Sequence, residues 1–148
     1  MEYCGFCNYK NNKEDTILFE NAFCVCLMRN EPILIGSCVI IPKAHKETIF
    51  DLSYEEWEAT KQIIDETKKF LDSKYKPDGY NVGWNVGTVG GQEATPFFHA
   101  HLHIIPRYAD EPYAGRGIRS WIKQNEKMRP NNKENKNEAD CAVSFRIG

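Results

Sequence analysis

The chain has 148 residues, enough for one domain that buries roughly 68–70% of the surface its unfolded form exposes. With 41% hydrophobic residues, 27% charged residues and a net charge of −2, the composition is that of a soluble globular protein without the basic surface of a general nucleic-acid binder. The N-terminus has no apolar run after a basic start, and no segment approaches the ~18–20 apolar residues of a membrane span. We therefore expect a cytoplasmic protein that has neither a nucleic-acid nor a membrane partner.

The first half of the chain predicts three strands and one long helix. Strands are expected at residues 16–20 and 22–28, joined by a tight turn at Glu20 and Asn21, and at residues 36–42, ending at Pro42. Ser53 and Glu56 form a capping box that starts a helix running from about Tyr54 to Lys74. Its predicted apolar stripe consists of Trp57, Thr60, Ile63, Ile64, Thr67, Phe70 and Leu71.

The second half predicts a hairpin and a polar tail. The alternating segment GYNVGWNVG (79–87) and the segment FFHAHLHIIPRY (97–108) read as strands, and their short connection favours antiparallel pairing. Asn85 should then share one polar face with the histidines, while Ala100, Leu102 and Ile104 are buried. GIRSWIKQ predicts a short helix or an extended arm. We assign residues 1–127 to one domain and 128–148 to a polar, partly disordered tail, with CAVSFRIG as a candidate edge strand.

Five of the six cysteines fall into two groups. In a reducing compartment a disulfide framework is not expected. Cys24, Cys26 and Cys38 lie in apolar, strand-like runs and are predicted to be small core residues. Cys4 and Cys7 instead form a C-x-x-C knuckle in a loop-like N-terminus, where a metal site competes with the simpler interpretation of two reduced thiols.

Three of the four histidines, His99, His101 and His103, alternate along one segment. Alternate side chains of a strand point the same way, so the three imidazoles can grip one metal ion or handle a phosphate group. Three solvated surface histidines are the remaining interpretation. The fourth histidine, His45, follows a buried strand, and with Cys4, Cys7 and one histidine of the triplet it completes the Cys₂His₂ set of structural zinc.

These motifs resemble the histidine triad (HIT) family of nucleotide hydrolases and transferases, in its zinc-binding bacterial-type branch. HAHLHIIPR matches the family's alternating histidine motif, and the resemblance extends over residues 4–108 through CGFC, GSCVIIPKAH and GYNVGWNVGTVGGQ. It implies an α+β fold with a central antiparallel sheet of about five strands, one long and one short helix, and a two-fold homodimer.

The resemblance also implies a reaction on a purine nucleotide or dinucleotide. His101 matches the histidine that attacks the α-phosphorus and forms a nucleotidyl-histidine intermediate, which water then hydrolyses. His103 and Asn85 match groups that contact the phosphate or the leaving group, and the backbone around Gly91 and Gln92 matches the phosphate pocket. The substrate is expected to be a nucleoside phosphoramidate or a dinucleoside polyphosphate.

The zinc ligands of the family match Cys4, Cys7, His45 and His99, which agrees with the set of two cysteines, His45 and one triplet histidine that ligand chemistry suggests. This zinc would be structural. A divalent ion bound to a polyphosphate substrate is compatible with the scheme, although no catalytic metal is required.

The chain departs from the family pattern at two places. Pro96 occupies the position where a hydroxyl residue often precedes the first histidine, so Thr95 or a backbone amide would have to take over that role. Where the family often places Asp or Asn on the ribose, this chain has Arg29 and Asn30, and we assign the ribose contact to Asn30; Ser37 replaces the usual histidine after the glycine.

Two other functions stay open from the sequence. One is a non-catalytic nucleotide-binding or sensor protein with a structural zinc site. The other is a metalloenzyme that uses all three histidines of the triplet on a catalytic ion. A Cys4→Ala variant separates the two metal sites, because only the structural site would lose its ion.

Overall fold

The computed structural model describes residues 3–94 and 96–124, which divide into two units along the chain between Ala114 and Gly115. The predicted domain boundary at residue 127, the tail at 128–148 with its candidate edge strand, and Thr95 lie outside the described residues. Within these residues no helix is both long and apolar enough to cross a bilayer.

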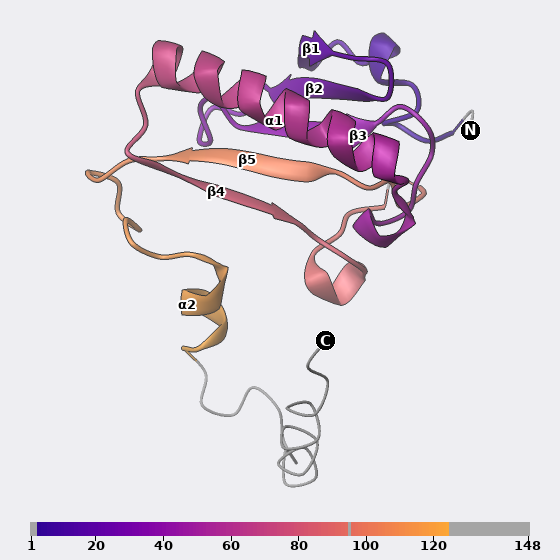
Figure 1. Cartoon of the computed structure of the whole chain (residues 1–148). Coiled ribbons are helices and arrows are strands. Elements are labelled where there is room, and N and C mark those ends of the chain that lie inside the picture. The colour runs from indigo at the N-terminus through magenta and orange to yellow at the C-terminus, as the bar shows by residue number, and fades with distance from the viewer. Residues whose placement is uncertain (1–2, 95, 125–148) are drawn as a thin grey trace, which may run out of the picture. The chain divides into compact units, whose positions relative to one another are not determined.

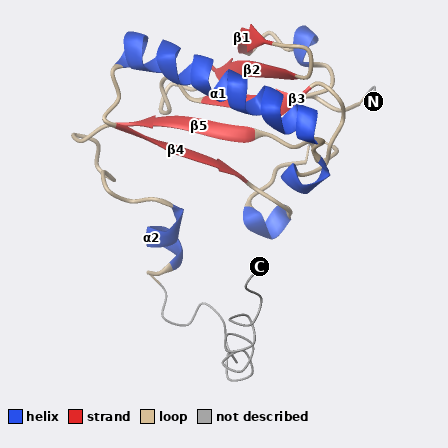
Figure 2. Cartoon of the chain, viewed as in Figure 1, coloured by secondary structure: helices blue, strands red, loops and turns tan. Residues whose placement is uncertain are grey.

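The first unit is built on a five-stranded antiparallel sheet with the order β1-β2-β3-β5-β4 (Figures 1 and 2). The strands are β1 (Asp15–Glu20), β2 (Cys24–Arg29), β3 (Cys38–Pro42), β4 (Gly79–Trp84) and β5 (Leu102–Arg107). Short 3-10 helices lie at Tyr9–Asn11 (η1), Ile49–Asp51 (η2) and Thr88–Gly90 (η3). The predicted α+β class, the five strands and the antiparallel pairing of the last two strands are confirmed.

One long helix, α1 (Tyr54–Tyr75), lies across one face of the sheet (Figure 1). Its capping box forms as predicted: the Glu56 amide donates to Ser53 Oγ at 3.1 Å, and the Ser53 amide donates to Glu56 Oε2 at 2.8 Å. The helix ends at Tyr75, because the next residue, Lys76, has a left-handed φ of 48° and precedes a proline that cannot continue the helix. Trp57 departs from the predicted apolar stripe, because it is about half exposed while Ala59 takes a place in the core.

The central strands are buried on both faces, which explains their nearly continuous apolar sequence. One face packs against α1 and includes Cys24, Cys26 and Cys38, so the prediction that these cysteines are core residues is confirmed. The opposite face carries a second apolar cluster of Val25, Leu27, Val39 and Ile41, covered by Tyr9 and Phe6 of the N-terminal segment.

The histidine segment is only partly a strand. β5 begins at Leu102, so the expected strand over 97–108 is shorter than predicted, and His99 and His101 lie in the segment that leads into it. The amide of Ala100 donates to the carbonyl of Lys46 at 2.7 Å, which attaches this segment to the chain after β3. Ala100, Leu102 and Ile104 are buried as expected, but His99 and His101 are buried too because the N-terminal segment covers their side.

The second unit begins at Gly115 and contains α2 (Ile118–Ile122). The sequence predicted either a short helix or an extended arm for this segment, and the structure has the helix. Arg116 lies 5.4 Å from the ring centroid of Trp121, a cation–π contact within this unit.

Candidate functional site

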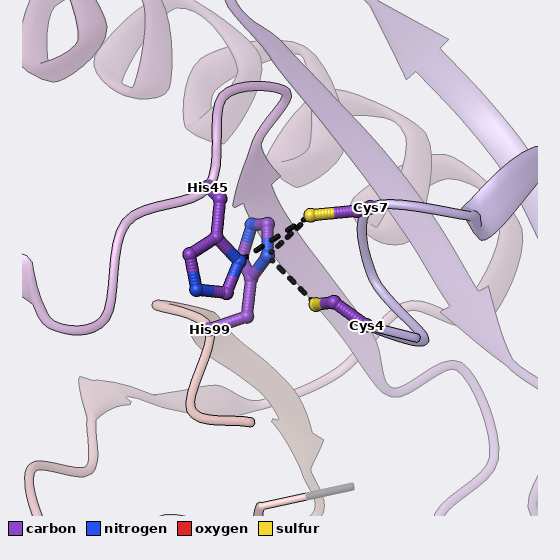
Figure 3. A group of neighbouring side chains, drawn as sticks. All are labelled: Cys4, Cys7, His45 and His99. Carbon is purple, nitrogen blue, oxygen red and sulfur yellow. Dashed lines mark hydrogen bonds between the residues drawn. The ribbon is translucent and has the colours of Figure 1, made fainter. Parts of the chain in front are cut away.

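Four predicted metal ligands from three parts of the chain come together at one point (Figure 3). Cys4 and Cys7 come from the N-terminal segment, His45 from the chain after β3, and His99 from the approach to β5. His99 Nδ1 lies 3.4 Å from Cys4 Sγ and 3.6 Å from Cys7 Sγ, and His45 Nδ1 lies 3.3 Å from Cys7 Sγ. All four ligand atoms lie within 4.8 Å of one another.

These distances suit a tetrahedral site of the zinc type. With metal–sulfur and metal–nitrogen bonds of about 2.3 and 2.0–2.1 Å, tetrahedral geometry separates a sulfur from a nitrogen by about 3.5 Å. A donor set of two sulfurs and two imidazole nitrogens also binds zinc in preference to harder cations. Cys4, Cys7, His45 and His99 can therefore hold a metal ion.

His99 is prepared for this role by its other ring nitrogen. Its Nε2 lies 2.9 Å from the carbonyl oxygen of Pro42, which can only accept a hydrogen bond, so Nε2 carries the proton and Nδ1 presents a lone pair to the cluster. Burial, with the nearby charges of His45 and His101, lowers the pKa of His99 to about 4, against the smaller opposing effect of the Pro42 hydrogen bond. The ring is thus neutral near pH 7, as a metal ligand must be.

The same reasoning sets the tautomer of His101. Its Nδ1 lies 2.8 Å from the carbonyl oxygen of His99, so in the neutral ring Nδ1 donates and Nε2 is unprotonated. The rings of His101 and His103 meet edge to face, with centroids 4.8 Å apart. Burial, and to a smaller extent the charges of His101 and Arg29, lower the pKa of His103, while the Glu93 carboxylate opposes that shift.

His103 projects from the sheet face opposite α1. The register aligns Leu27 of β2, Val39 of β3, His103 of β5 and Gly83 of β4 in one row across the sheet. Since Leu27 and Val39 belong to the cluster under the N-terminal segment, His103 shares their face.

A loop after β4 is fastened beside the histidines. The Asn85 side-chain amide donates to the Gly91 carbonyl at 3.3 Å, and Gly91 has a φ of 88°, a conformation that favours glycine. The buried Gln92 donates through Nε2 to the Glu47 carbonyl at 2.6 Å and accepts from the Gly87 amide at 2.9 Å. Gln92 therefore ties this loop to the segment after β3.

A cavity of about 580 Å³ opens on this face of the sheet. Its lining includes His101, His103, Asn85 and Gly91 among the predicted site residues. Gln92 does not line it, because its side chain is turned inward to the two backbone partners. Asn30 does not line it either: its amide donates to the Glu14 carbonyl and the Thr16 hydroxyl at the start of β1.

Several cavity residues were not predicted from the sequence. Arg29 and Glu31, on either side of Asn30, line the cavity, as does Glu93 after the fastened loop. Phe6 also lines it, and its ring centroid lies 5.0 Å from that of His101 and 5.7 Å from that of His99. The position of Phe6 between two metal-ligating cysteines was the one sequence signal that could have identified it.

The comparisons with known proteins agree with this architecture. The solved structure of a HIT family member from Bacillus subtilis has a TM-score of 0.69 at 20% identity, covering 98% of this chain and 97% of that one. A zinc-bound histidine triad family protein from Mycobacterium smegmatis has a TM-score of 0.65 at 21% identity, covering 95% and 98%.

Two curated relatives have named activities. Adenylylsulfatase HINT3 of Arabidopsis thaliana is 29% identical over 105 residues, which are 70% of this chain and 52% of the relative. The bis(5′-adenosyl)-triphosphatase of Saccharomyces cerevisiae is 29% identical over 100 residues, which are 64% and 45%. The model of the HIT domain matches residues 10–110, more than half of the sequence, and the chain therefore belongs to the HIT domain family.

Proposed function

We propose that this protein hydrolyses a nucleotide at its α-phosphate through a covalent intermediate on His101. The observation that carries the proposal is the hydrogen bond from His101 Nδ1 to the His99 carbonyl, which leaves Nε2 with a free lone pair at a cavity also lined by His103 and Asn85. A neutral imidazole with one fixed nitrogen is a competent nucleophile near pH 7.

The reaction proceeds in two displacements. In the first, the Nε2 lone pair of His101 forms a bond to the α-phosphorus while the bond to the leaving group breaks, and the leaving group departs with that electron pair and takes up a proton from solvent. In the second, a water oxygen forms a bond to the same phosphorus, the P–Nε2 bond breaks with its electrons returning to His101, and the water proton passes to solvent. The products are a nucleoside monophosphate and the free leaving group.

The neighbouring groups would hold the phosphoryl oxygens. His103 and the amide of Asn85 are donors at the same cavity, and the glycine-containing loop lets its backbone approach closely. For the ribose hydroxyls, the cavity supports the Glu31 carboxylate as an acceptor rather than Asn30, which points to β1. Zinc held by Cys4, Cys7, His45 and His99 would stiffen the segment that carries His101.

The relatives' names support the proposed substrate class. One is named for adenylyl sulfate and the other for bis(5′-adenosyl) triphosphate. We propose an adenine or other purine nucleotide as the half that stays on His101, with a phosphoramidate or a dinucleoside polyphosphate as the whole substrate. The homodimer and a divalent ion on a polyphosphate substrate stay predictions.

The test is intact-protein mass spectrometry after an acid quench with an adenosine phosphoramidate. The expected result is a mass increase of one adenylyl group that is absent in His101→Ala, with AMP release lowered at least about a thousandfold in that variant. Asn85→Ala, which removes a proposed phosphate donor that also binds the Gly91 carbonyl, should keep the adduct while slowing its formation. Near-normal turnover by His101→Ala would overturn the nucleophile, and AMP binding without turnover would support a nucleotide-binding protein instead.

A further inference from the structure

Glu93 is a carboxylate at the cavity that the proposed reaction does not yet use. It lines the cavity together with His101, His103 and Asn85. Within residues 3–94 and 96–124 it makes no ion pair and no hydrogen bond, so its charge is not neutralised by a neighbouring cation. It is close enough to His103 for its negative charge to act on that ring.

The position of Glu93 is fixed by its neighbour in sequence. Gln92 is held through both ends of its side-chain amide, to the Glu47 carbonyl and the Gly87 amide, and its own backbone amide donates to the Gly87 carbonyl at 3.0 Å. Glu93 follows this anchor directly and is exposed. This anchor places the Glu93 carboxylate at the cavity.

The remaining charges of the cavity do not offset Glu93. Apart from the histidines, the described lining holds one cationic side chain, Arg29, and two carboxylates, Glu31 and Glu93. Arg29 Nε already lies 3.3 Å from Asp15 Oδ1 and 3.8 Å from Glu31 Oε1. The cavity therefore lacks the excess of positive charge that a polyphosphate chain, with several negative charges, requires.

We infer that Glu93 is a specificity-determining residue that selects the charge of the leaving group, favouring cationic amines and disfavouring polyphosphates. The inference rests on the proposed function. When the P–N bond of a phosphoramidate breaks, the bond electrons stay on nitrogen, and the neutral amine takes up a further proton only afterwards, from solvent. The nitrogen must be protonated before the bond breaks, so it carries a positive charge on the way to the transition state. A nearby carboxylate stabilises that positive charge, whereas a phosphate leaving group gains negative charge that the same carboxylate repels.

The test uses adenosine 5′-phosphoramidates that share one scissile P–N bond and one alkyl chain and differ only at the far end of the chain, which carries an ammonium, a methyl or a carboxylate group. The wild-type protein should have a kcat/KM for the ammonium form about fivefold to tenfold above that for the carboxylate form. Glu93→Gln should remove this preference, and Glu93→Lys should reverse it. High salt should reduce the preference, since the site is open to solvent.

Two controls separate a local effect from a change in net charge. Glu66→Gln removes the same charge from an exposed position on α1, across the sheet from the cavity, and should keep the wild-type preference. Diadenosine triphosphate should gain in kcat/KM, relative to the ammonium phosphoramidate, in Glu93→Lys. If Glu93→Gln keeps the wild-type preference for the ammonium over the carboxylate form, the role of Glu93 is overturned, even when the protein hydrolyses every substrate.

A binding measurement makes the inference independent of turnover. In His101→Ala, calorimetry should find tighter binding of the ammonium form than of the carboxylate form, and Glu93→Gln in that background should equalise the two dissociation constants. If the wild-type protein turns over none of the compounds but this binding preference is present, the hydrolase proposal fails while the role of Glu93 in charge selection stands. Equal binding of the two forms in His101→Ala would contradict the role of Glu93.

Discussion

The role that each histidine can play at this site depends on which of its ring nitrogens already donates a hydrogen bond. His99 and His101 are two residues apart, yet one donates from Nε2 to Pro42 and the other from Nδ1 to His99. These opposite choices leave Nδ1 of His99 for the metal cluster and Nε2 of His101 for the cavity. Neither choice is visible in a motif, because the motif states only that a histidine is present.

His103 supplies a prediction for the pH dependence of stability. Its folded-state pKa is lowered from the ordinary 6.5, chiefly by burial, so the unfolded chain binds this proton more readily than the folded protein does. The free energy of unfolding should therefore fall as the pH drops below about 6.5 toward the lower folded-state pKa. His103→Gln, which cannot titrate, should lose less stability between pH 7.5 and pH 5.5 in urea denaturation. Equal losses in both proteins would show that His103 does not contribute.

At the scale of elements, the N-terminal segment forms one wall of the cavity. Cys4 and Cys7 belong to the metal cluster, while Phe6 between them contacts the rings of both His99 and His101. Tyr9 extends the same wall over the apolar cluster of Val25, Leu27, Val39 and Ile41. The segment that carries two candidate metal ligands thus also shapes the surroundings of the proposed nucleophile.

This arrangement predicts that Phe6 positions His101. Phe6→Leu keeps an apolar side chain but removes the ring contact, so the rate of adduct formation should fall about tenfold while metal content and AMP affinity change little. Phe6→Tyr, which keeps the ring, should form the adduct at nearly the wild-type rate. Phe50→Leu, the same change at an exposed position of η2, is the control. A loss of metal from Phe6→Leu would instead assign Phe6 to the metal site.

For the whole molecule, the metal cluster joins segments that are far apart in sequence. It connects residues 4 and 7 to residues 45 and 99, on a sheet whose order brings β3 beside β5. A zinc ion bound by these four residues would contribute directly to folding, because the unfolded chain does not hold the ligands together. The two edges of this sheet are β1 and β4, and the expected homodimer stays a prediction.

We expect about one zinc ion per chain by atomic spectroscopy, lost in Cys4→Ala together with a melting temperature lower by about 5 °C or more. Cys24→Ala, at a buried cysteine of the α1-facing core, should keep the ion even if its melting temperature also falls. His101→Ala should keep the ion as well. Retention of metal in Cys4→Ala with its loss in His101→Ala would place the ion on the three histidines instead.

The elements with strong local signals could be predicted from the sequence alone. α1 starts at the predicted capping box and ends one residue after the predicted position, and the apolar runs around Cys24 and Cys38 are central strands. Ligand chemistry predicted a set of Cys4, Cys7, His45 and one histidine of the triplet, and the resemblance to the HIT family predicted that this histidine is His99. Trp57 was placed wrongly, since helical periodicity alone does not show which edge of a stripe meets the sheet.

Other features depend on contacts between distant segments, so only the tertiary structure decided them. β5 starts at Leu102 rather than at Phe97, because the residues just before Leu102 bind other segments. Ala100 and His99 form hydrogen bonds with the carbonyls of Lys46 and Pro42, and the N-terminal segment packs against this part of the chain. Arg29 and Glu31 rather than Asn30 line the cavity, because successive residues at a strand end face opposite sides of the sheet. The pairing of β2 with β1 decides which of these residues face the cavity. The chain's composition and motifs thus determined the fold class and the candidate metal ligands, whereas packing across the sheet decided which nitrogens and which charges face the cavity.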